Sequence, residues 1–280
     1  MNSRIIIEPG AKGKNYWQDL WKFRELFYFL AWRDVIVRYK QAVIGIAWSV
    51  IKPLLTVVIF AVVGRVLHTA VPFGVPRLIF VCIGILPWQF FSTAFSESSN
   101  SLLANSNLLT KVYFPRLIVP ASTIIVSLID FLTSLGLLFV FMIYYRYVPA
   151  WNIVLLPAFL LQATMISMGA GIYIAALNVK YRDFKFIVPF IVQFGLYISP
   201  VWFSSDQYVY QNVKVPEVLK FVYSLNPMVG VIDGFRWCIL GGKTDLYMPG
   251  FLLSITVCFL VLFLGIWYFR KVEKSFADVI

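Results

Sequence analysis

Long apolar stretches recur along the chain, and polar or charged residues separate them. A helix that crosses the roughly 30 Å hydrocarbon core of a bilayer needs about 20 mostly apolar residues. Six stretches come near or exceed that length, at residues 42–67, 78–96, 117–145, 153–177, 186–203 and 248–269. The pattern predicts an all-α integral membrane protein. Its six-span domain (42–269) lies between an N-terminal segment (1–41) and a short tail (270–280).

Composition supports a membrane protein and argues against several other classes. Of the 280 residues, 60% are hydrophobic and 13% are charged, and the mean hydropathy is +0.82. A soluble domain of this length needs more polar surface to cover its core. His68 is the single histidine, and Cys238, one of three cysteines, is interpreted as a loop residue. We expect no disulfide framework, no metal site and no catalytic residue.

Lysine and arginine are distributed unevenly among the connecting segments. They concentrate in residues 1–41, in the loops after the second and fourth stretches, and in the tail. Because cytoplasmic segments have such an excess, we expect both termini in the cytoplasm. Residues 1–14 show no cleavable signal peptide, so the first span would act as the signal. We attribute the net charge of +11 to this topology and to anionic lipid, not to a nucleic-acid partner.

The segment 16–41 has charges throughout, so it is not a span. Its apolar and polar side chains separate on a helical wheel, which predicts an interfacial amphipathic helix on the cytoplasmic leaflet. The apolar face consists of Trp17, Leu20, Trp21, Tyr28, Ala31 and Val35. This helix is either an anchor for the first span or a gate beside a substrate entrance.

Two other segments between the spans stand out. Residues 97–111 are polar and small but contain two leucine pairs, which favours a short docking helix over a simple connector. Residues 216–226 and 227–240 look helical, and the second segment is too apolar for a solvated loop but too short to span. We expect re-entrant or interfacial helices on the external side, acting as a gate or packing against the last two spans.

Charged residues within the spans are sparse, with Lys52 and Asp130 as the clear cases. Ion-coupled carriers place several such groups at mid-membrane. We expect Lys52 to snorkel and Asp130 to pair with a hydroxyl group. Small residues at 167, 171 and 175 predict close approach of another helix to the fourth span.

Two further patterns bear on chemistry. Residues 242–244 resemble the end of a phosphate-binding loop, but Trp237 occupies the position of the required glycine, so this chain should not hydrolyse nucleotide. Aromatic residues make up 18% of the chain and many lie near span ends. They form either an interfacial belt or the lining of a carbohydrate conduit.

A resemblance to a known family rests on several groups of residues in order. They are RDVIVRYKQ (33–41) with GIAW (45–48) and Pro53, KVYFPR (111–116) with Pro120, YRD (181–183) with Ser199 and Pro200, LNPM (225–228), and GFR (234–236). Together they resemble the membrane subunit of type-2 ABC exporters of bacterial polysaccharides such as O-antigen, capsule and teichoic acid. The likeness runs from about residue 20 to 275.

The resemblance implies a homodimeric permease in the bacterial inner membrane, paired with two copies of a separate ATP-binding subunit. ATP and Mg would act on that partner, and this chain would not be an enzyme. The substrate would be a glycan linked to a polyprenyl diphosphate lipid. The resemblance also implies three sets of functional residues. The set that couples to the ATPase is Ser99, Asn100, Leu103, Asn105, Asn107 and Leu108. The set that meets the lipid diphosphate at the substrate entrance is Arg38, Lys40 and Arg182. The external gate set is Phe221, Asn226, Pro227, Gly234, Phe235 and Trp237.

Two alternative functions stay open. One is a type-2 ABC permease for a drug or a small lipid. The other is an integral-membrane transferase acting on a lipid-linked sugar, which needs a general base or a metal-binding carboxylate pair. The single His68 and the absence of an Asp-x-Asp motif argue against the transferase. Lys52 departs from the family pattern, which leads us to expect a neutral residue there.

Overall fold

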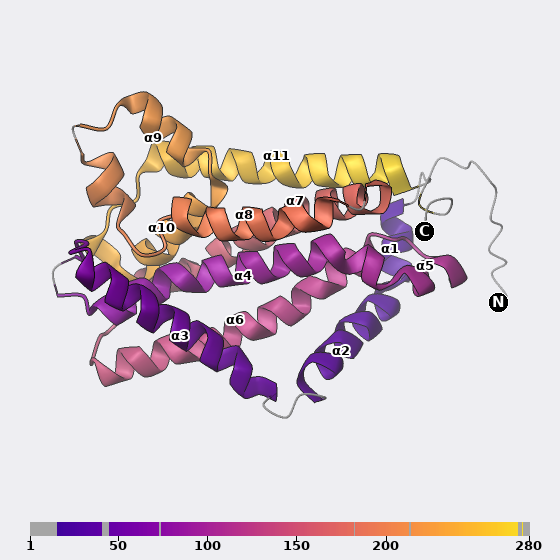
Figure 1. Cartoon of the computed structure of the whole chain (residues 1–280), viewed down its shortest axis with the longest axis horizontal. Helices are drawn as coiled ribbons and strands as arrows, with labels where there is room; N and C mark the ends of the chain where they lie inside the picture. The colour runs from indigo at the N-terminus through magenta and orange to yellow at the C-terminus, as the bar shows by residue number, and fades with distance from the viewer. Residues whose placement is uncertain are drawn as a thin grey trace.

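The computed structural model describes residues 16–40, 45–72, 74–181, 183–212, 214–273 and 276. In this part of the chain the secondary structure is helical, and Figure 1 shows an elongated bundle. The helices are α1 (Tyr16–Lys22), α2 (Arg24–Lys40), α3 (Gly45–Val66), α4 (Arg77–Ala104), α5 (Ser106–Lys111), α6 (Ile118–Tyr144), η1 (Trp151–Leu155), α7 (Leu156–Lys180), α8 (Phe184–Ile198), η2 (Asp206–Tyr210), α9 (Glu217–Ser224), α10 (Pro227–Leu240), η3 (Gly241–Lys243) and α11 (Met248–Val272).

Five of the described helical runs are long and apolar enough to cross a membrane: α3, α4, α6, η1 with α7, and α11. The helix α8 has 15 residues, about 22 Å at 1.5 Å per residue, which is short of the roughly 30 Å apolar core. The prediction that this helix continues to residue 203 is wrong. Ser199 is extended (ψ 151°), because a residue that precedes a proline, here Pro200, avoids the helical region.

The helix α4 forms the centre of the bundle. It packs against α3, α6, α7, α8 and α10, and its most apolar stretch is largely buried. Gly171 of α7 lets that helix approach α4, because a Cβ atom there would lie 2.6 Å from the Cβ of Ser98. Gly265 of α11 approaches α7 more closely still, with its Cβ position 2.2 Å from the Gly169 carbonyl oxygen. The close approach predicted for the fourth span is therefore confirmed.

The opposite ends of the bundle contain different short helices. In Figure 1, α1, α5 and the end of α11 lie at one end, while α9 and α10 lie at the other.

The segment 97–111 is not one short helix, because α4 continues to Ala104 and α5 is a separate short helix after Asn105. The two predicted helices around the Asn226–Pro227 step are confirmed as α9 and α10. Cys238 is buried within α10, so its interpretation as a loop residue is wrong.

Apolar side chains occupy more than one face of α1 and α2. Ala31 of the predicted apolar face is buried, together with Leu30, where α2 packs against α6. Trp17, Trp21 and Tyr28 of the same predicted face are exposed. Part of the predicted face therefore binds the bundle, and its aromatic part remains available to lipid.

Candidate functional site

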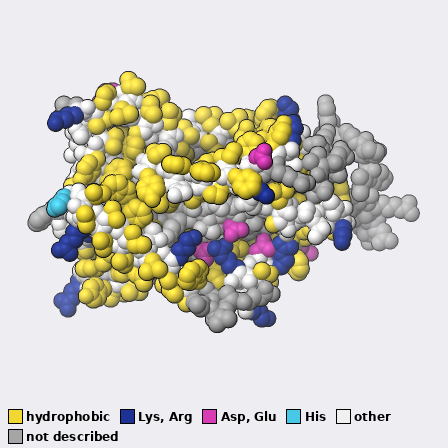
Figure 2. All heavy atoms as spheres, viewed as in Figure 1, with side chains coloured by type: hydrophobic (Ala, Val, Ile, Leu, Met, Phe, Trp, Pro, Cys, Tyr) yellow, Lys and Arg dark blue, Asp and Glu magenta, His cyan; other side chains and the backbone are white. Residues whose placement is uncertain are grey.

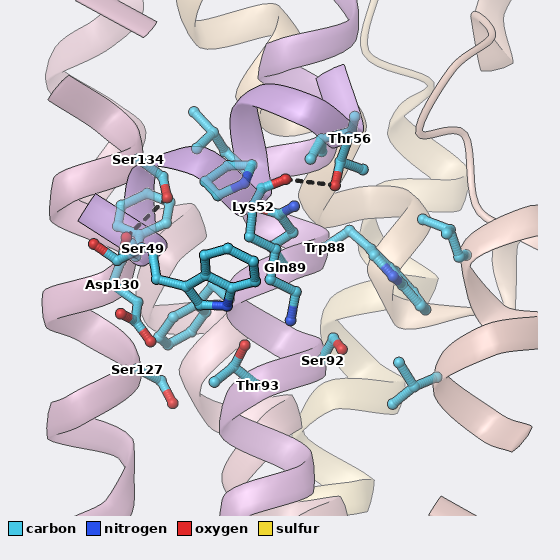
Figure 3. Close-up of a pocket in the computed structure, with 18 of the residues that line it drawn as sticks. Ser49, Lys52, Thr56, Trp88, Gln89, Ser92, Thr93, Ser127, Asp130 and Ser134 are labelled. Carbon is cyan, nitrogen blue, oxygen red and sulfur yellow. Dashed lines mark hydrogen bonds between the residues drawn. The ribbon is translucent and has the colours of Figure 1, made fainter. Parts of the chain in front are cut away.

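A cavity of about 710 Å³ lies between the end of α2 and the helices α3, α4, α6 and α8. Each of the long helices contributes positions about one turn apart. On α3 these positions include Ser49, Lys52 and Thr56, which follow one another at intervals of three and four residues. Figure 3 shows these side chains around a shared space with Gln89 of α4 and Asp130 of α6.

The lining combines hydroxyl, amide and aromatic side chains. The neutral polar members are Ser49, Thr56, Gln89, Ser92, Thr93, Ser127, Ser134 and Gln193. The aromatic members are Tyr39, Trp48, Trp88, Phe90 and Phe131. Hydroxyl and amide groups can exchange hydrogen bonds with a hydroxylated ligand. Aromatic rings offer an apolar body beside them, so this lining suits an amphipathic cargo.

A charged cluster at one side of the cavity joins three helices. Arg38 of α2 pairs with Asp130 of α6 at 2.7 Å and with Glu97 of α4 at 3.4 Å. The Tyr39 hydroxyl donates to the other Asp130 oxygen at 2.6 Å. The expectation that Asp130 pairs with a hydroxyl group is therefore confirmed. Figure 2 shows acidic and basic side chains gathered near the middle of this face, with hydrophobic side chains around them.

Tyr39 remains a hydrogen-bond donor in this cluster. Burial raises the pKa of its phenol above the ordinary value, and the hydrogen bond to Asp130 raises it further. The proton therefore stays on Tyr39, which donates it to the hydrogen bond with Asp130. The end of α2 is tied to α6 by both this hydrogen bond and the ion pair from Arg38.

Lys52 differs from Arg38 because no described carboxylate forms an ion pair with it. Its side chain is exposed in this chain and lines the cavity. Ser127 lines the same cavity, and its buried hydroxyl has no hydrogen-bond partner among the described residues. Among the described residues, the Lys52 ammonium group therefore has no ion-pair partner, and the Ser127 hydroxyl in the cavity wall has no hydrogen-bond partner.

Of the three residues predicted to meet a lipid diphosphate, the structure describes Arg38 and Lys40. Arg38 reaches the cavity, but two carboxylates already engage it. Lys40 is exposed at the end of α2 and does not line the cavity. Arg182 lies outside the described residues. Sequence reasoning missed Gln89, Ser92 and Thr93, although their spacing of three and four residues within an apolar stretch was the available signal.

The residues predicted to couple to an ATPase differ in their exposure. Ser99 is buried, its hydroxyl donates to the Phe95 carbonyl at 2.6 Å, and its carbonyl accepts from Asn178 of α7 at 2.8 Å. Asn100 and Asn107 are exposed, while three others are partly buried: Leu103, Asn105 and Leu108. Asn105 also accepts a hydrogen bond from Arg33 of α2 at 2.9 Å.

The residues predicted to form the external gate, in and around α9 and α10, also differ in their exposure. Phe235 is fully buried in α10, with its ring edge-on to Phe131 of α6, and Gly234 lies against the ring of Phe159. Trp237 is partly buried in the same helix. Helix α10 packs on α4, α7 and α11, so it is fixed to the bundle. Helix α9 and the residue that follows it instead expose several large apolar side chains: Val218, Leu219, Phe221, Val222 and Leu225.

The junction between α9 and α10 depends on Asn226. Its side chain caps α10 by accepting from the Met228 backbone at 3.1 Å, and it donates to the Ser199 hydroxyl at 2.9 Å. Pro227 occupies the first turn of α10, where no backbone donor is needed.

Arg236, the last residue of the GFR motif (234–236), is buried in α10, a role that the sequence did not predict. Arg236 donates to the carbonyl oxygens of Phe203 (2.6 Å) and Val201 (3.1 Å), and its guanidinium lies 4.1 Å from the ring centroid of Phe80. These contacts fasten the segment after α8 to α10 and α4. Nearby, Asp233 accepts from the Ser205 hydroxyl at 2.9 Å, and burial raises its pKa to about 6.

Comparisons with known proteins agree with this architecture. The chain is 26% identical over 259 residues to the O-antigen export system permease protein RfbA of Klebsiella pneumoniae, covering 89% of this chain and 92% of that protein. It is 29% identical over 223 residues to the protein of the same name from Myxococcus xanthus, covering 78% and 82%. It is 21% identical over 258 residues to the polysialic acid transport protein KpsM of Escherichia coli, covering 87% and 92%. A family model described as ABC-2 type transporter matches residues 25–240. Because that match covers more than half of the chain, the protein belongs to the ABC-2 type transporter family.

Proposed function

We propose that this chain is the permease subunit of an ATP-driven exporter that moves a polyprenyl-diphosphate-linked polysaccharide from the cytoplasm across the bacterial inner membrane. The observation that carries the proposal is the cavity of about 710 Å³ among the long helices, with its mixed hydroxyl, amide and aromatic lining. The names of the relatives, which are permeases or transport proteins for O-antigen and polysialic acid, support this cargo class.

The cavity is open along one side of a single chain, so we propose that a second copy completes the conduit. Two such copies would work with two copies of a separate ATP-binding subunit, which would bind ATP and Mg. In this arrangement α8, which lies beside α4 and α7, makes the sixth crossing together with the segment that follows it (199–203), since α8 alone is only 15 residues long. Both termini then lie in the cytoplasm, which accords with the end of the bundle shared by α1 and the end of α11 in Figure 1.

The cytoplasmic end of α4 together with α5 is the proposed docking surface for the ATP-binding subunit. Asn100 and Asn107 are exposed there, and the partly buried Leu103 and Leu108 provide apolar contact. Ser99 would act from within, since it fastens α4 to α7. The bond from Arg33 to Asn105 would link the docking surface to the amphipathic helix α2.

At the external end, α9 is the proposed moving part of a gate. Its exposed Phe221 would close the exit against the second copy, and Asn226 with Pro227 would form the joint. Gly234, Phe235 and Trp237 would hold α10 against the bundle as the fixed base. The exposed apolar residues of α9 support this role, because exposing them to water costs roughly 25 cal/mol per Å².

Transport in reconstituted vesicles tests the proposal. The chain and its ATP-binding partner are placed in vesicles with a fluorescent lipid-linked oligosaccharide, and ATP-dependent movement across the bilayer is measured. The native complex should move this cargo, and a complex with a hydrolysis-deficient partner should not. The variant Gln89→Leu should slow transport because it removes an amide from the cavity, whereas Gln18→Leu on exposed α1 should not. Movement of a small lipid or drug without movement of the glycan would refute the proposed cargo.

A further inference from the structure

We infer that Lys52 is a specificity-determining residue that binds an anionic group, a phosphate or a carboxylate, of the cargo inside the cavity. The inference rests on the proposed export function, and it assigns anion recognition to Lys52 in place of the predicted entrance residues Arg38 and Lys40.

The position of Lys52 places its charge within the cavity. The residue lies seven positions after the start of α3, about 10 Å along the helix axis at 1.5 Å per residue. Ser49 and Thr56 are on the same face of α3, and all three line the cavity. Figure 3 shows Lys52 on α3 and Gln89 on α4 bordering the same space. The ammonium group therefore shares a water-accessible compartment with polar groups of two helices.

The other charges lining the cavity are already paired. Asp130 is the one carboxylate in the cavity lining among the described residues, and it engages Arg38 through one oxygen and Tyr39 through the other. Glu97 adds a second carboxylate to Arg38. Arg38 is consequently poorly available to a ligand, whereas Lys52 forms no ion pair with a described carboxylate.

A second observation also points to a ligand in this cavity. The Ser127 hydroxyl is buried, lines the cavity, and lacks a hydrogen-bond partner among the described residues. Buried hydroxyl groups are normally satisfied, so this enclosed hydroxyl keeps an unused hydrogen bond at the cavity wall, which a ligand oxygen reaches when the neighbouring side chains shift. An anion bound at Lys52, with neutral donors such as Gln89 and Thr93 nearby, has the donor chemistry that phosphate and carboxylate oxygens require.

A cation at this position would favour an anionic cargo over a neutral one. An unpaired charge within a membrane helix is costly, so it persists where water or a charged ligand meets it. A cargo with an anionic group replaces the water around Lys52 with a charge-assisted hydrogen bond, and a neutral cargo gains nothing from the ammonium group. The anionic group can belong to the lipid diphosphate or to acidic sugars, and the chemistry at Lys52 is the same for both.

Binding to the full permease–ATPase complex in lipid nanodiscs tests the inference. The probes are undecaprenyl diphosphate, an oligogalacturonate, and the same oligosaccharide after reduction of its carboxyl groups, which is neutral. Lys52→Gln should weaken binding of at least one of the two anionic probes by about tenfold or more, since charged hydrogen bonds have that strength. Lys52→Arg keeps the charge and should retain most of the affinity. The neutral oligosaccharide should bind native protein and Lys52→Gln equally.

Lys271→Gln is the matched control, because it removes one exposed lysine at the end of α11, outside the cavity. Loss confined to undecaprenyl diphosphate assigns the anion to the lipid head group, and loss confined to oligogalacturonate assigns it to the glycan. Equal affinity of native protein and Lys52→Gln for both anionic probes would overturn the inference, and so would equal weakening for the neutral probe. A native complex that transports only a small lipid or drug, and no glycan, would instead overturn the proposed function itself.

Discussion

Arg38 at the end of α2 forms a 2.7 Å ion pair with Asp130 in the middle of α6, and this contact fastens α2 to a long apolar helix. Both side chains are partly exposed, at 36% and 19%, so solvent screens the attraction. We expect a double-mutant cycle of Arg38→Gln and Asp130→Asn to give a coupling energy of about 1 kcal/mol, measured by thermal unfolding in detergent. A second cycle on the exposed pair Lys22 and Asp19 should give less. A coupling energy near zero for Arg38 and Asp130 would show that the contact is incidental.

The buried Arg236 should be one of the most sensitive positions for stability. Arg236→Met leaves the carbonyl oxygens of Phe203 and Val201 without their donor in a buried site. We expect a loss of about 3 kcal/mol, because each orphaned buried acceptor costs about 1–3 kcal/mol. Arg65→Met, which removes an exposed arginine at the end of α3, should change stability by less than about 0.5 kcal/mol. Equal midpoints of thermal unfolding for the two variants would contradict this assignment.

Asp233 should make stability depend on pH. Burial raises its pKa to about 6, although the charge of Arg236 and the hydrogen bond from Ser205 act in the opposite direction. The carboxyl of Asp206 and the phenols of Tyr210 and Tyr223 also interact electrostatically with Asp233. An unfolded aspartate has a pKa of about 3.9, so the folded state binds the proton more tightly. The stabilisation is therefore complete below about pH 4 and is lost as the pH rises through 6.

The variant Asp233→Asn should remove this contribution. Unfolding midpoints measured between about pH 4 and 7 should fall with rising pH more steeply for the native protein than for Asp233→Asn, by of order 2 kcal/mol across the window. Glu217→Gln, which neutralises an exposed carboxyl on α9, should keep the native slope. Parallel curves for native protein and Asp233→Asn would remove Asp233 from the explanation.

The contact between α7 and α11 should tolerate no side chain at Gly265. A Cβ atom there would lie 2.2 Å from the Gly169 carbonyl oxygen, which is backbone and cannot move aside easily. We expect Gly265→Ala to destabilise the protein by about 1–3 kcal/mol. Gly136→Ala is the matched control, because nothing lies within 4 Å of its Cβ position in α6, and it should be neutral or stabilising. The comparison uses thermal unfolding of both variants in the same detergent.

The proposed docking surface leads to a prediction about coupling. Leu108→Asp on α5 should weaken association with the ATP-binding subunit and reduce export by about tenfold, because a charge would be desolvated where the partner covers it. Membrane levels and the unfolding midpoint should stay near native values, since Leu108 is only partly buried in this chain. Gln18→Asp on exposed α1 is the charge control. Normal association and export by Leu108→Asp would place the docking surface elsewhere.

The sequence alone determined which segments form helices, because the length of an apolar run and the position of a proline act on the local backbone. Each long run of apolar residues can satisfy its backbone within a bilayer only as a helix, so five of the six predicted spans appear as long apolar helices. The same logic found α9 and α10, since the Asn226–Pro227 step must interrupt a helix. The ordered motifs were sufficient to identify the family, which the match over residues 25–240 bears out.

Tertiary structure decided which polar residues share a site. The pairing of Arg38 with Asp130 joins positions 92 residues apart, and nothing in local periodicity relates them. The same limitation hid the buried role of Arg236, whose carbonyl partners lie 33 and 35 residues away in an irregular segment. Ser99 of the predicted coupling set and Phe235 of the predicted gate set are both buried, and sequence gives the face of a helix without saying which neighbour covers it. Helix packing makes that choice, and it leaves Lys52 in the cavity without a described carboxylate partner.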